Sequence, residues 1–280
     1  MPDTKESREE IAQYYQSVSR IDQGFGKLMK MLQETGKANN TIVIYISDNG
    51  MAFPGAKTTV HEPGIKLPCI IKDPTKGVKN ATSNAMISWV DLTPTILDMA
   101  KIDFKKEQFH GKSFNKIIEK SNPEGWDEIY ASHTFHEITM YYPMRVVRSK
   151  NYKLIWNIAW RLEYPFASDL WASSTWQGIY RNKIEKFGPK KVQDYLFRPE
   201  FELYDLEKDP DELNNLSKNK DFTLEQTTIS PFEIQKADEV FITNAIIGVQ
   251  PVTSYKKKKF TTEVGSKIAG NLKVLQITGV

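Results

Sequence analysis

An apolar run at residues 41–46 constrains the fold of this 280-residue chain more than any other segment. It reads Thr-Ile-Val-Ile-Tyr-Ile and is rich in β-branched residues, which is typical of a short strand buried on both faces. Before it, residues 7–35 carry apolar side chains at helical spacing, and Gly36 is well placed to end that helix. A helix that leads into a buried strand indicates an α/β fold with a parallel sheet. We therefore predict that residues 41–46 form a central strand.

Further helix and strand signals divide the chain into three parts. Residues 67–71 predict a second short buried strand, and residues 86–100 predict a helix that Asp91 could cap. From about Trp126 the pattern changes to short strands of antiparallel type, at residues 128–132, 144–149, 152–157 and 201–206. We expect an α/β domain over residues 1–115, a small antiparallel α+β subdomain over 125–222, and an appended segment over 223–280.

Composition and charge exclude several classes of protein. The chain is 40% hydrophobic and 26% charged, as in soluble globular proteins, and its net charge of +3 indicates neither a nucleic-acid nor a membrane partner. Its single cysteine, Cys69, excludes an internal disulfide framework and a multi-cysteine zinc site. No apolar run approaches the roughly 20 residues that span a bilayer, and no signal peptide is visible at the N-terminus. The sequence does not indicate an oligomeric state.

Asp48 and Asn49 follow the predicted strand at 41–46 directly. Open α/β sheets bind their ligands at the carboxyl ends of strands. A carboxylate beside an amide carbonyl offers two hard oxygens, which suit a divalent cation such as calcium. Asp-Asn-Gly is also common turn chemistry, so a metal site and a simple turn are both open interpretations.

Three other side chains are candidates for contact with a ligand. Lys57 lies in the loop at 55–59, where its point charge could meet an anion or simply be solvated. His136 and Glu137, with His133 nearby, could line a polar pocket or lie at a strand edge. Cys69, in an apolar segment, is interpreted as an inert thiol.

Several motifs occur in the order found in one known family. They are the helix with Asp22, the strand ending in Asp48-Asn49-Gly50, the Lys57 loop, Gly64-Ile65-Lys66-Leu67-Pro68, Asp91-Leu92-Thr93-Pro94-Thr95, and Glu202-Leu203-Tyr204-Asp205-Leu206 followed by Asp209-Pro210 and Asn215-Leu216. Together they resemble the sulfatase family over residues 7–222. The segment 136–145, with Phe53-Pro54, is similar to the sulfamidase (heparan N-sulfatase) branch of that family.

The resemblance implies part of an alkaline-phosphatase-like sheet layer, followed by the small antiparallel subdomain. Asp48 and Asn49 would be calcium ligands, Lys57 would contact the sulfate, and His136 and Glu137 would face the substrate pocket. The substrate would carry sulfate esters or N-sulfo groups on a glycosaminoglycan-like sugar. Members of the family are usually secreted, periplasmic or lysosomal.

One departure from the family concerns the nucleophile. Sulfatases use a formylglycine made from a Cys/Ser-x-Pro/Ala-x-Arg motif, whereas Cys69 is followed by Ile70-Ile71-Lys72 and no serine opens such a motif. We therefore expect the calcium site to be incomplete and this chain to be inactive alone, as a fragment of a sulfatase. Two alternatives are a non-catalytic carbohydrate-binding remnant and a protein related to class IV aminotransferases.

The second alternative rests on the segment 229–252, which resembles the C-terminus of class IV pyridoxal-phosphate aminotransferases. There, residues 243–245 would lie near the cofactor phosphate. We expect a strand at 237–242 with an unpaired edge, a loop containing Gly248 and Pro251, and a solvated turn at 256–259. A gene fusion, a deletion or an error in assembling the gene sequence would each produce such a junction.

Overall fold

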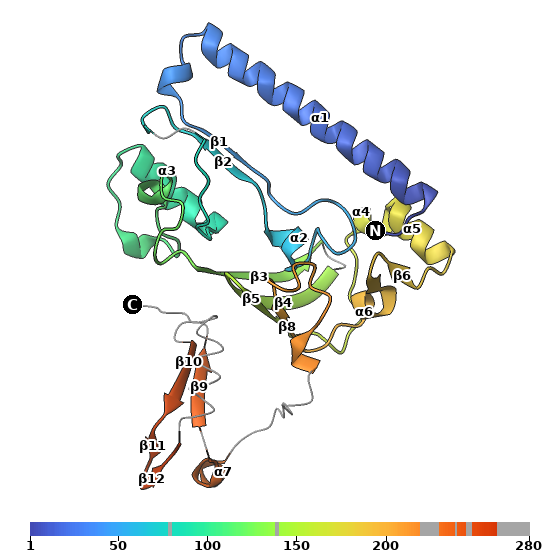
Figure 1. The fold of residues 1–280 in the computed structure, drawn as a ribbon, viewed down its shortest axis with the longest axis vertical. Coiled ribbons are helices and arrows are strands. Elements are labelled where there is room, and N and C mark those ends of the chain that lie inside the picture. Colours follow the sequence, from blue (N-terminus) through green and yellow to red (C-terminus); the bar gives the residue numbers. More distant parts are fainter. Residues whose placement is uncertain (78–79, 138–139, 219–229, 239, 245–247, 262–280) are drawn as a thin grey trace. The chain divides into compact units, whose positions relative to one another are not determined.

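The computed structural model describes residues 1–77, 80–137, 140–218, 230–238, 240–244 and 248–261 (Figure 1). These residues belong to two compact units, each built from several stretches of chain. The first unit comprises Met1–Ala81, Ser132–Arg145 and Asn157–Glu200, and the second comprises Thr82–Ala131, Val146–Trp156 and Phe201–Val280. Among the described residues, no helix combines the length and apolar character needed to cross a membrane.

The first unit begins with a 30-residue helix, α1 (Lys5–Glu34), as the sequence predicts. The Thr4 side chain caps its start by accepting a hydrogen bond from the Ser7 N–H at 3.2 Å. The helix ends just before Gly36, whose φ of 69° few other residues adopt easily. Ser7 is its one buried residue, and the apolar side chains further along, such as Ile21 and Leu28, are exposed.

The predicted strand at 41–46 is present, but its expected surroundings are wrong. After the short helix η1 (Ala38–Asn40), β1 (Val43–Ile46) pairs antiparallel with β2 (Cys69–Lys72) in a two-stranded sheet. Between them, residues 47–68 contain only the single-turn helix α2 (Glu62–Ile65), whereas parallel strands are usually joined by a longer helical crossover. β1 is therefore neither central nor covered on both faces here. The prediction was wrong because an apolar run does not specify which strands lie beside it.

The rest of the first unit gathers around aromatic rings. It contains α4 (Ser168–Ala172), α5 (Ser174–Arg181), the strands β6 (Lys186–Phe187) and β7 (Lys190–Lys191), and α6 (Val192–Leu196) (Figure 1). The buried Arg198 guanidinium lies 3.6 Å from the ring centroid of Tyr164 and 5.2 Å from that of Tyr195. These cation–π contacts offset part of the loss of hydration of a buried charge. At α5, the Thr175 N–H donates to the Glu10 carboxylate of α1 at 2.8 Å.

The second unit contains the helix predicted at 86–100, as η2 (Trp89–Asp91) followed by α3 (Leu92–Met99). Asp91 stands at the N-cap position of α3, but its carboxylate does not cap that helix. It accepts instead from the N–H groups of Ser88 at 2.9 Å and Lys112 at 2.8 Å, so it joins two loops. Two further single turns follow, η3 (Lys106–Gln108) and η4 (Asn115–Ile117).

The predicted antiparallel strands form one four-stranded sheet. Its order is β3-β4-β5-β8, from β3 (Glu128–His136), β4 (Met140–Ser149), β5 (Tyr152–Asn157) and β8 (Phe201–Asp205). Beyond β8, before η5 (Leu216–Lys218), Glu212 forms an ion pair with Lys153 of β5 at 2.9 Å, and both side chains are fully buried.

The described part of the tail corrects two expectations. After α7 (Pro231–Lys236), β9 (Val240–Asn244) pairs with β10 (Gly248–Val252) in an antiparallel two-stranded sheet. The segment 240–242 therefore has a strand partner along one edge, although its other edge is unpaired within this two-stranded sheet, and Gly248 and Pro251 lie in a strand rather than a loop. Proline is tolerated there because a two-stranded sheet leaves one side of β10 without ladder hydrogen bonds. Ala245, in the turn assigned to a cofactor phosphate, lies outside the described residues.

In the lysine-rich segment at 256–259, Lys256 and Lys257 form the expected turn, whereas Lys258 and Lys259 lie in a strand. The turn joins β11 (Ser254–Tyr255) to β12 (Lys258–Lys259), and the side chains of Lys256 and Lys257 are exposed.

Candidate active site

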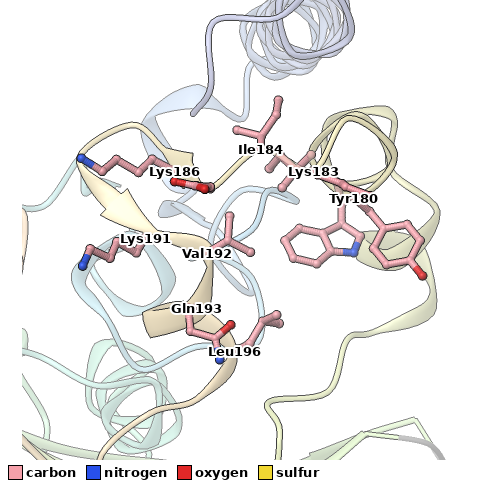
Figure 2. A pocket seen from close by; sticks show the side chains of 11 residues that line it. Tyr180, Lys183, Ile184, Lys186, Lys191, Val192, Gln193 and Leu196 are labelled. Carbon is pink, nitrogen blue, oxygen red and sulfur yellow. The ribbon is translucent and has the colours of Figure 1, made fainter.

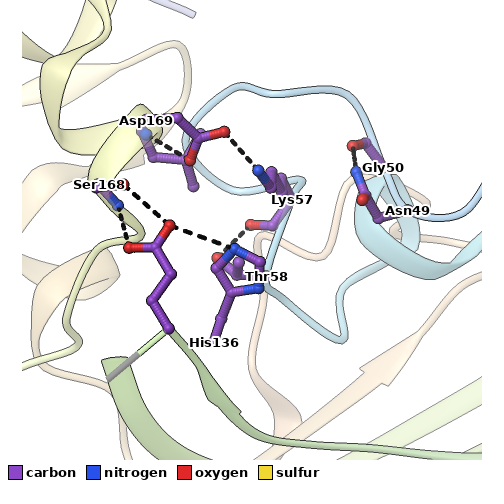
Figure 3. Close-up of polar contacts among 9 residues, drawn as sticks. Asn49, Gly50, Lys57, Thr58, His136, Ser168 and Asp169 are labelled. Atoms are coloured by element: carbon purple, nitrogen blue, oxygen red, sulfur yellow. Dashed lines mark hydrogen bonds and ion pairs between the residues drawn. The ribbon is translucent and has the colours of Figure 1, made fainter. Parts of the chain in front are cut away.

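Lys57 forms an ion pair with Asp169 of α4 in the first unit (Figure 3). The lysine side chain is only 17% exposed, whereas that of Asp169 is 47% exposed. The loop that carries Lys57 is fixed by its neighbour Thr58, which has a φ of 64° and accepts a hydrogen bond from the buried Tyr164 hydroxyl at 2.7 Å. The ion pair thus joins Lys57 to Asp169, a residue 112 positions further along the chain.

Two glycines allow this loop to fold so tightly. A Cβ atom on Gly50 would lie 2.2 Å from the Pro63 carbonyl oxygen, and one on Gly64 would lie 2.4 Å from the Thr59 carbonyl oxygen. Both distances are far inside van der Waals contact, so any larger residue would push the loop apart.

Glu137 joins the same part of the structure to α4. It follows β3 with a φ of 59°, a left-handed backbone conformation that is uncommon outside glycine. Its carboxylate accepts from the Ser168 hydroxyl at 2.9 Å and from the Ser168 N–H at 3.1 Å. The His136 Nε2 lies 3.7 Å from the same carboxylate (Figure 3). A carboxylate at a helix N-terminus is stabilised there by the unpaired backbone N–H groups.

The Lys57 ammonium and the Asp169 carboxylate compensate each other's charge. Partial burial alone would raise the pKa of Asp169, but the hydrogen bond and positive charge of Lys57 outweigh burial and lower it, with help from the Leu170 N–H and from His136. Asp169 therefore stays ionised at neutral pH and remains a counterion for Lys57. An ammonium has three N–H donors, so one carboxylate does not exhaust its capacity for an anion.

His133 plays a different part from His136. Its Nδ1 lies 3.3 Å from the Tyr142 carbonyl oxygen, which favours the tautomer with the proton on Nδ1. Burial lowers the pKa of His133, and the charges of His136 and Arg198 act in the same direction, against the opposing hydrogen bond to Tyr142. His133 is thus a neutral, half-buried histidine at neutral pH.

Asp48 and Asn49 are both exposed and are engaged in their own turn. The Asp48 carboxylate accepts from the Asn49 N–H at 2.9 Å, and the Asn49 amide donates to the Gly50 carbonyl at 2.7 Å. Among the described residues, no group of three or more His, Cys, Asp or Glu side chains could hold a metal ion. Calcium needs about six to eight oxygen ligands, so these two residues alone do not fit a complete site.

The structure thus brings together three of the five predicted residues. Lys57, His136 and Glu137 form a network with Asp169 and Ser168, both of which sequence reasoning missed. No signal marks Asp169, because an acidic residue in the first turn of a short helix is common and usually only stabilises that helix. Burial raises the pKa of the Cys69 thiol, as expected of an unreactive cysteine.

Two family profiles match the sequence of this chain. The profile described as Sulfatase matches residues 1–102, and that described as N-sulphoglucosamine sulphohydrolase, C-terminal, matches residues 55–167. Human N-sulphoglucosamine sulphohydrolase is 32% identical over 233 residues, covering 79% of this chain and 46% of the human protein. The chain belongs to the sulfatase family.

Solved structures confirm the α/β fold class of this sulfatase chain. A putative sulfatase from Bacteroides thetaiotaomicron superposes with a TM-score of 0.55 at 20% identity, over 76% of this chain and 39% of that one. A protein in complex with its substrate D-glucosamine-2-N,6-O-disulfate superposes with a TM-score of 0.51 at 22% identity, over 72% of this chain and 35% of that one.

The sulfatase chain spans about half the length of the curated relatives it matches. One of these, an ulvan-active sulfatase of Formosa agariphila, is 27% identical over 253 residues, covering 89% of this chain and 48% of its own length. Residues 1–222 make up less than 89% of the 280-residue chain, so the matched part must include some residues of the tail after 222.

Proposed function

We propose that this chain provides the sulfo-group-binding side of a sulfatase active site. The substrate class is sulfate esters or N-sulfo groups on glycosaminoglycan-like sugars. The observation that carries the proposal is the largely buried Lys57 ammonium, which Asp169 holds beside His136 and Glu137. Relatives of this chain are named for sulfated amino sugars, which supports the choice of substrate.

Lys57 would donate to the sulfo oxygens while it remains in contact with Asp169. The carboxylate restrains a long, flexible side chain, so less entropy is lost when the anion binds. His136 and Glu137, each more than a third exposed, would face the sugar and bind its hydroxyl or amino groups. A carboxylate and an imidazole together offer both an acceptor and a donor.

Asp48 and Asn49 would contribute two of the oxygen ligands of a calcium ion. Because the described residues do not complete such a site, its other ligands would come from outside them. Bound calcium would neutralise charge on the sulfo group. The formylglycine motif is also not found in this sequence, so we propose that the chain alone does not catalyse hydrolysis.

Isothermal titration calorimetry with N-sulfoglucosamine tests the proposal. Lys57→Met removes a charged hydrogen-bond donor worth about 1.5–3 kcal/mol, so binding should weaken roughly tenfold to a hundredfold. Asp169→Asn removes the carboxylate that restrains Lys57 and should weaken binding by up to about fivefold. Lys66→Met, a change at an exposed lysine of the same unit, serves as the control. Equal affinity of the wild type and Lys57→Met would overturn the proposal.

The absence of the formylglycine motif from this sequence also favours a second candidate, a non-catalytic carbohydrate-binding protein. A non-catalytic carbohydrate-binding protein would bind the sugar equally well. It would show no turnover even if the N-terminal half of another sulfatase were added to supply a nucleophile and the other calcium ligands. The aminotransferase alternative rests on the tail alone, and an absorbance band from bound pyridoxal phosphate would favour it.

A further inference from the structure

A cavity of about 440 Å³ lies in the first unit, among α5, β6, β7 and α6 (Figure 2). Its volume falls within the range of roughly 300–1,000 Å³ that is usual for small-molecule sites. The apolar part of its lining comes from Trp176, Ile179, Ile184, Val192 and Leu196. This cavity is not part of the Lys57 cluster, and nothing above assigns it a ligand.

Three lysines line the cavity, and two of them face each other. Lys186 and Lys191 are directly opposite partners in the β6–β7 pair, and both are exposed. Like charges directly opposite across two strands destabilise the pair, unless an anion lies between or beside them. Among the described residues, no ion pair engages these two lysines or Lys183, and Glu185 is the one acidic residue that lines the cavity.

An exposed aromatic ring lies on the other side of the cavity. Tyr180 of α5 is 61% exposed, and Figure 2 shows it on the same side as Lys183 and opposite Lys186 and Lys191, with Val192 and Leu196 between. A pyranose ring has an apolar face of C–H groups that can pack on an aromatic ring, while its substituents remain polar. The combination of a ring, an apolar floor and cations at one edge therefore suits an anionic sugar.

The cavity and the Lys57 cluster belong to consecutive helices. Asp169 lies in α4, and Trp176, Ile179 and Tyr180 lie in α5, which begins after the single residue Ser173. Contacts between aromatic rings join the two helices: the ring centroid of Trp171 in α4 lies 6.5 Å from that of Trp176 and 5.5 Å from that of Tyr180, both in α5.

We infer that this cavity is a second saccharide subsite, which binds an anionic sugar residue on the same chain as the sugar held at Lys57. The inference rests on the proposed function. Sulfate or carboxylate groups of that residue lie beside Lys186 and Lys191, and its ring packs against Tyr180. No residue that lines the cavity belongs to the Lys57 cluster, so the subsite acts only on substrates longer than the single sugar bound at Lys57.

Calorimetry with two ligands separates this subsite from the Lys57 cluster. The ligands are a sulfated heparin-derived hexasaccharide and the monosaccharide N-sulfoglucosamine. In the double variant Lys186→Gln, Lys191→Gln, loss of two exposed ion pairs should weaken hexasaccharide binding roughly fivefold to tenfold. Monosaccharide binding should not change. Tyr180→Ser should also weaken only hexasaccharide binding.

The control variant Lys116→Gln, Lys120→Gln removes the same net charge at two exposed lysines of the other unit. Unchanged hexasaccharide binding in the Lys186, Lys191 variant would overturn the inference, as would an equal loss in the control. If Lys57→Met leaves monosaccharide binding intact while the double variant still weakens the hexasaccharide, the proposed function fails and the subsite stands. A desulfated hexasaccharide that retains its carboxylates shows which anionic group the lysines bind.

Discussion

The buried ion pair between Lys153 and Glu212 gives the sharpest stability prediction for this sulfatase chain. Lys153 lies in β5, Glu212 follows β8, and neither side chain has any exposed surface. Substituting Lys153→Met fills nearly the same volume but removes the ammonium that pairs with the Glu212 carboxylate. A charge left alone in a core either stays ionised at great cost or takes up a proton.

Breaking such a pair typically costs about 3–5 kcal/mol, a large part of the roughly 5–15 kcal/mol that stabilises a domain. With a urea dependence of about 3 kcal/mol per molar, the unfolding midpoint would fall by roughly 1–1.7 M. The double variant Lys153→Met, Glu212→Leu replaces both charges by apolar groups. It should recover most of that loss, because the desolvation cost of both ions disappears with them.

Urea unfolding of the full chain, followed by circular dichroism, measures these differences. Lys150→Met is the matched control: Lys150 pairs with Asp127 at 2.5 Å in the same unit, but the two side chains are 49% and 50% exposed. An exposed pair contributes about 1 kcal/mol or less, so the control should barely shift the midpoint. A Lys153→Met variant as stable as the control, or a double variant no better than the single one, would refute the reasoning.

Four further predictions follow from the site and the tail. Tyr164→Phe removes the hydrogen bond to the Thr58 carbonyl and should cost about 1–2 kcal/mol in urea unfolding, with weaker binding of N-sulfoglucosamine. Burial lowers the pKa of His133 below its usual 6.5, so as the pH falls the unfolded chain takes up a proton at this histidine before the folded chain does. The free energy of unfolding should therefore be highest above about pH 6.5 and decrease at lower pH, and it should decrease less in His133→Gln. The chain alone should release no sulfate from aryl sulfates or N-sulfoglucosamine, and turnover that disappears in Asp48→Ala would contradict this. Truncation after Phe222 should hardly lower the thermal midpoint if the tail is a separate segment, and a fall of many degrees would show that it is integral.

Much of the fold could be predicted because its signals are local. The periodicity of α1, the glycine at its end, and the alternation in β4 and β5 each depend on a few neighbouring residues. The partners of β1 could not be predicted in this way, because an apolar strand contains no record of how many strands flank it. Pairing of β9 with β10 was missed for a related reason: Gly248 and Pro251 weaken a strand signal, yet a two-stranded sheet tolerates them.

The site could be predicted only in part. Lys57, His136 and Glu137 stand in recognisable motifs, whereas Asp169 acquires its role through a contact with a residue 112 positions away. Asp48 and Asn49 form the turn that their sequence equally suggested, and their part in a calcium site stays a prediction. The domain division at 1–115, 125–222 and 223–280 likewise stays a prediction.

Nitrogen-15 NMR of the Lys57 ammonium tests the central claim most directly. During titration with N-sulfoglucosamine, the account predicts that the Lys57 resonance shifts and saturates with the affinity measured by calorimetry, while the Lys66 resonance stays in place. A sugar that binds without moving the Lys57 resonance would contradict the account, because the sulfo group would then be held elsewhere.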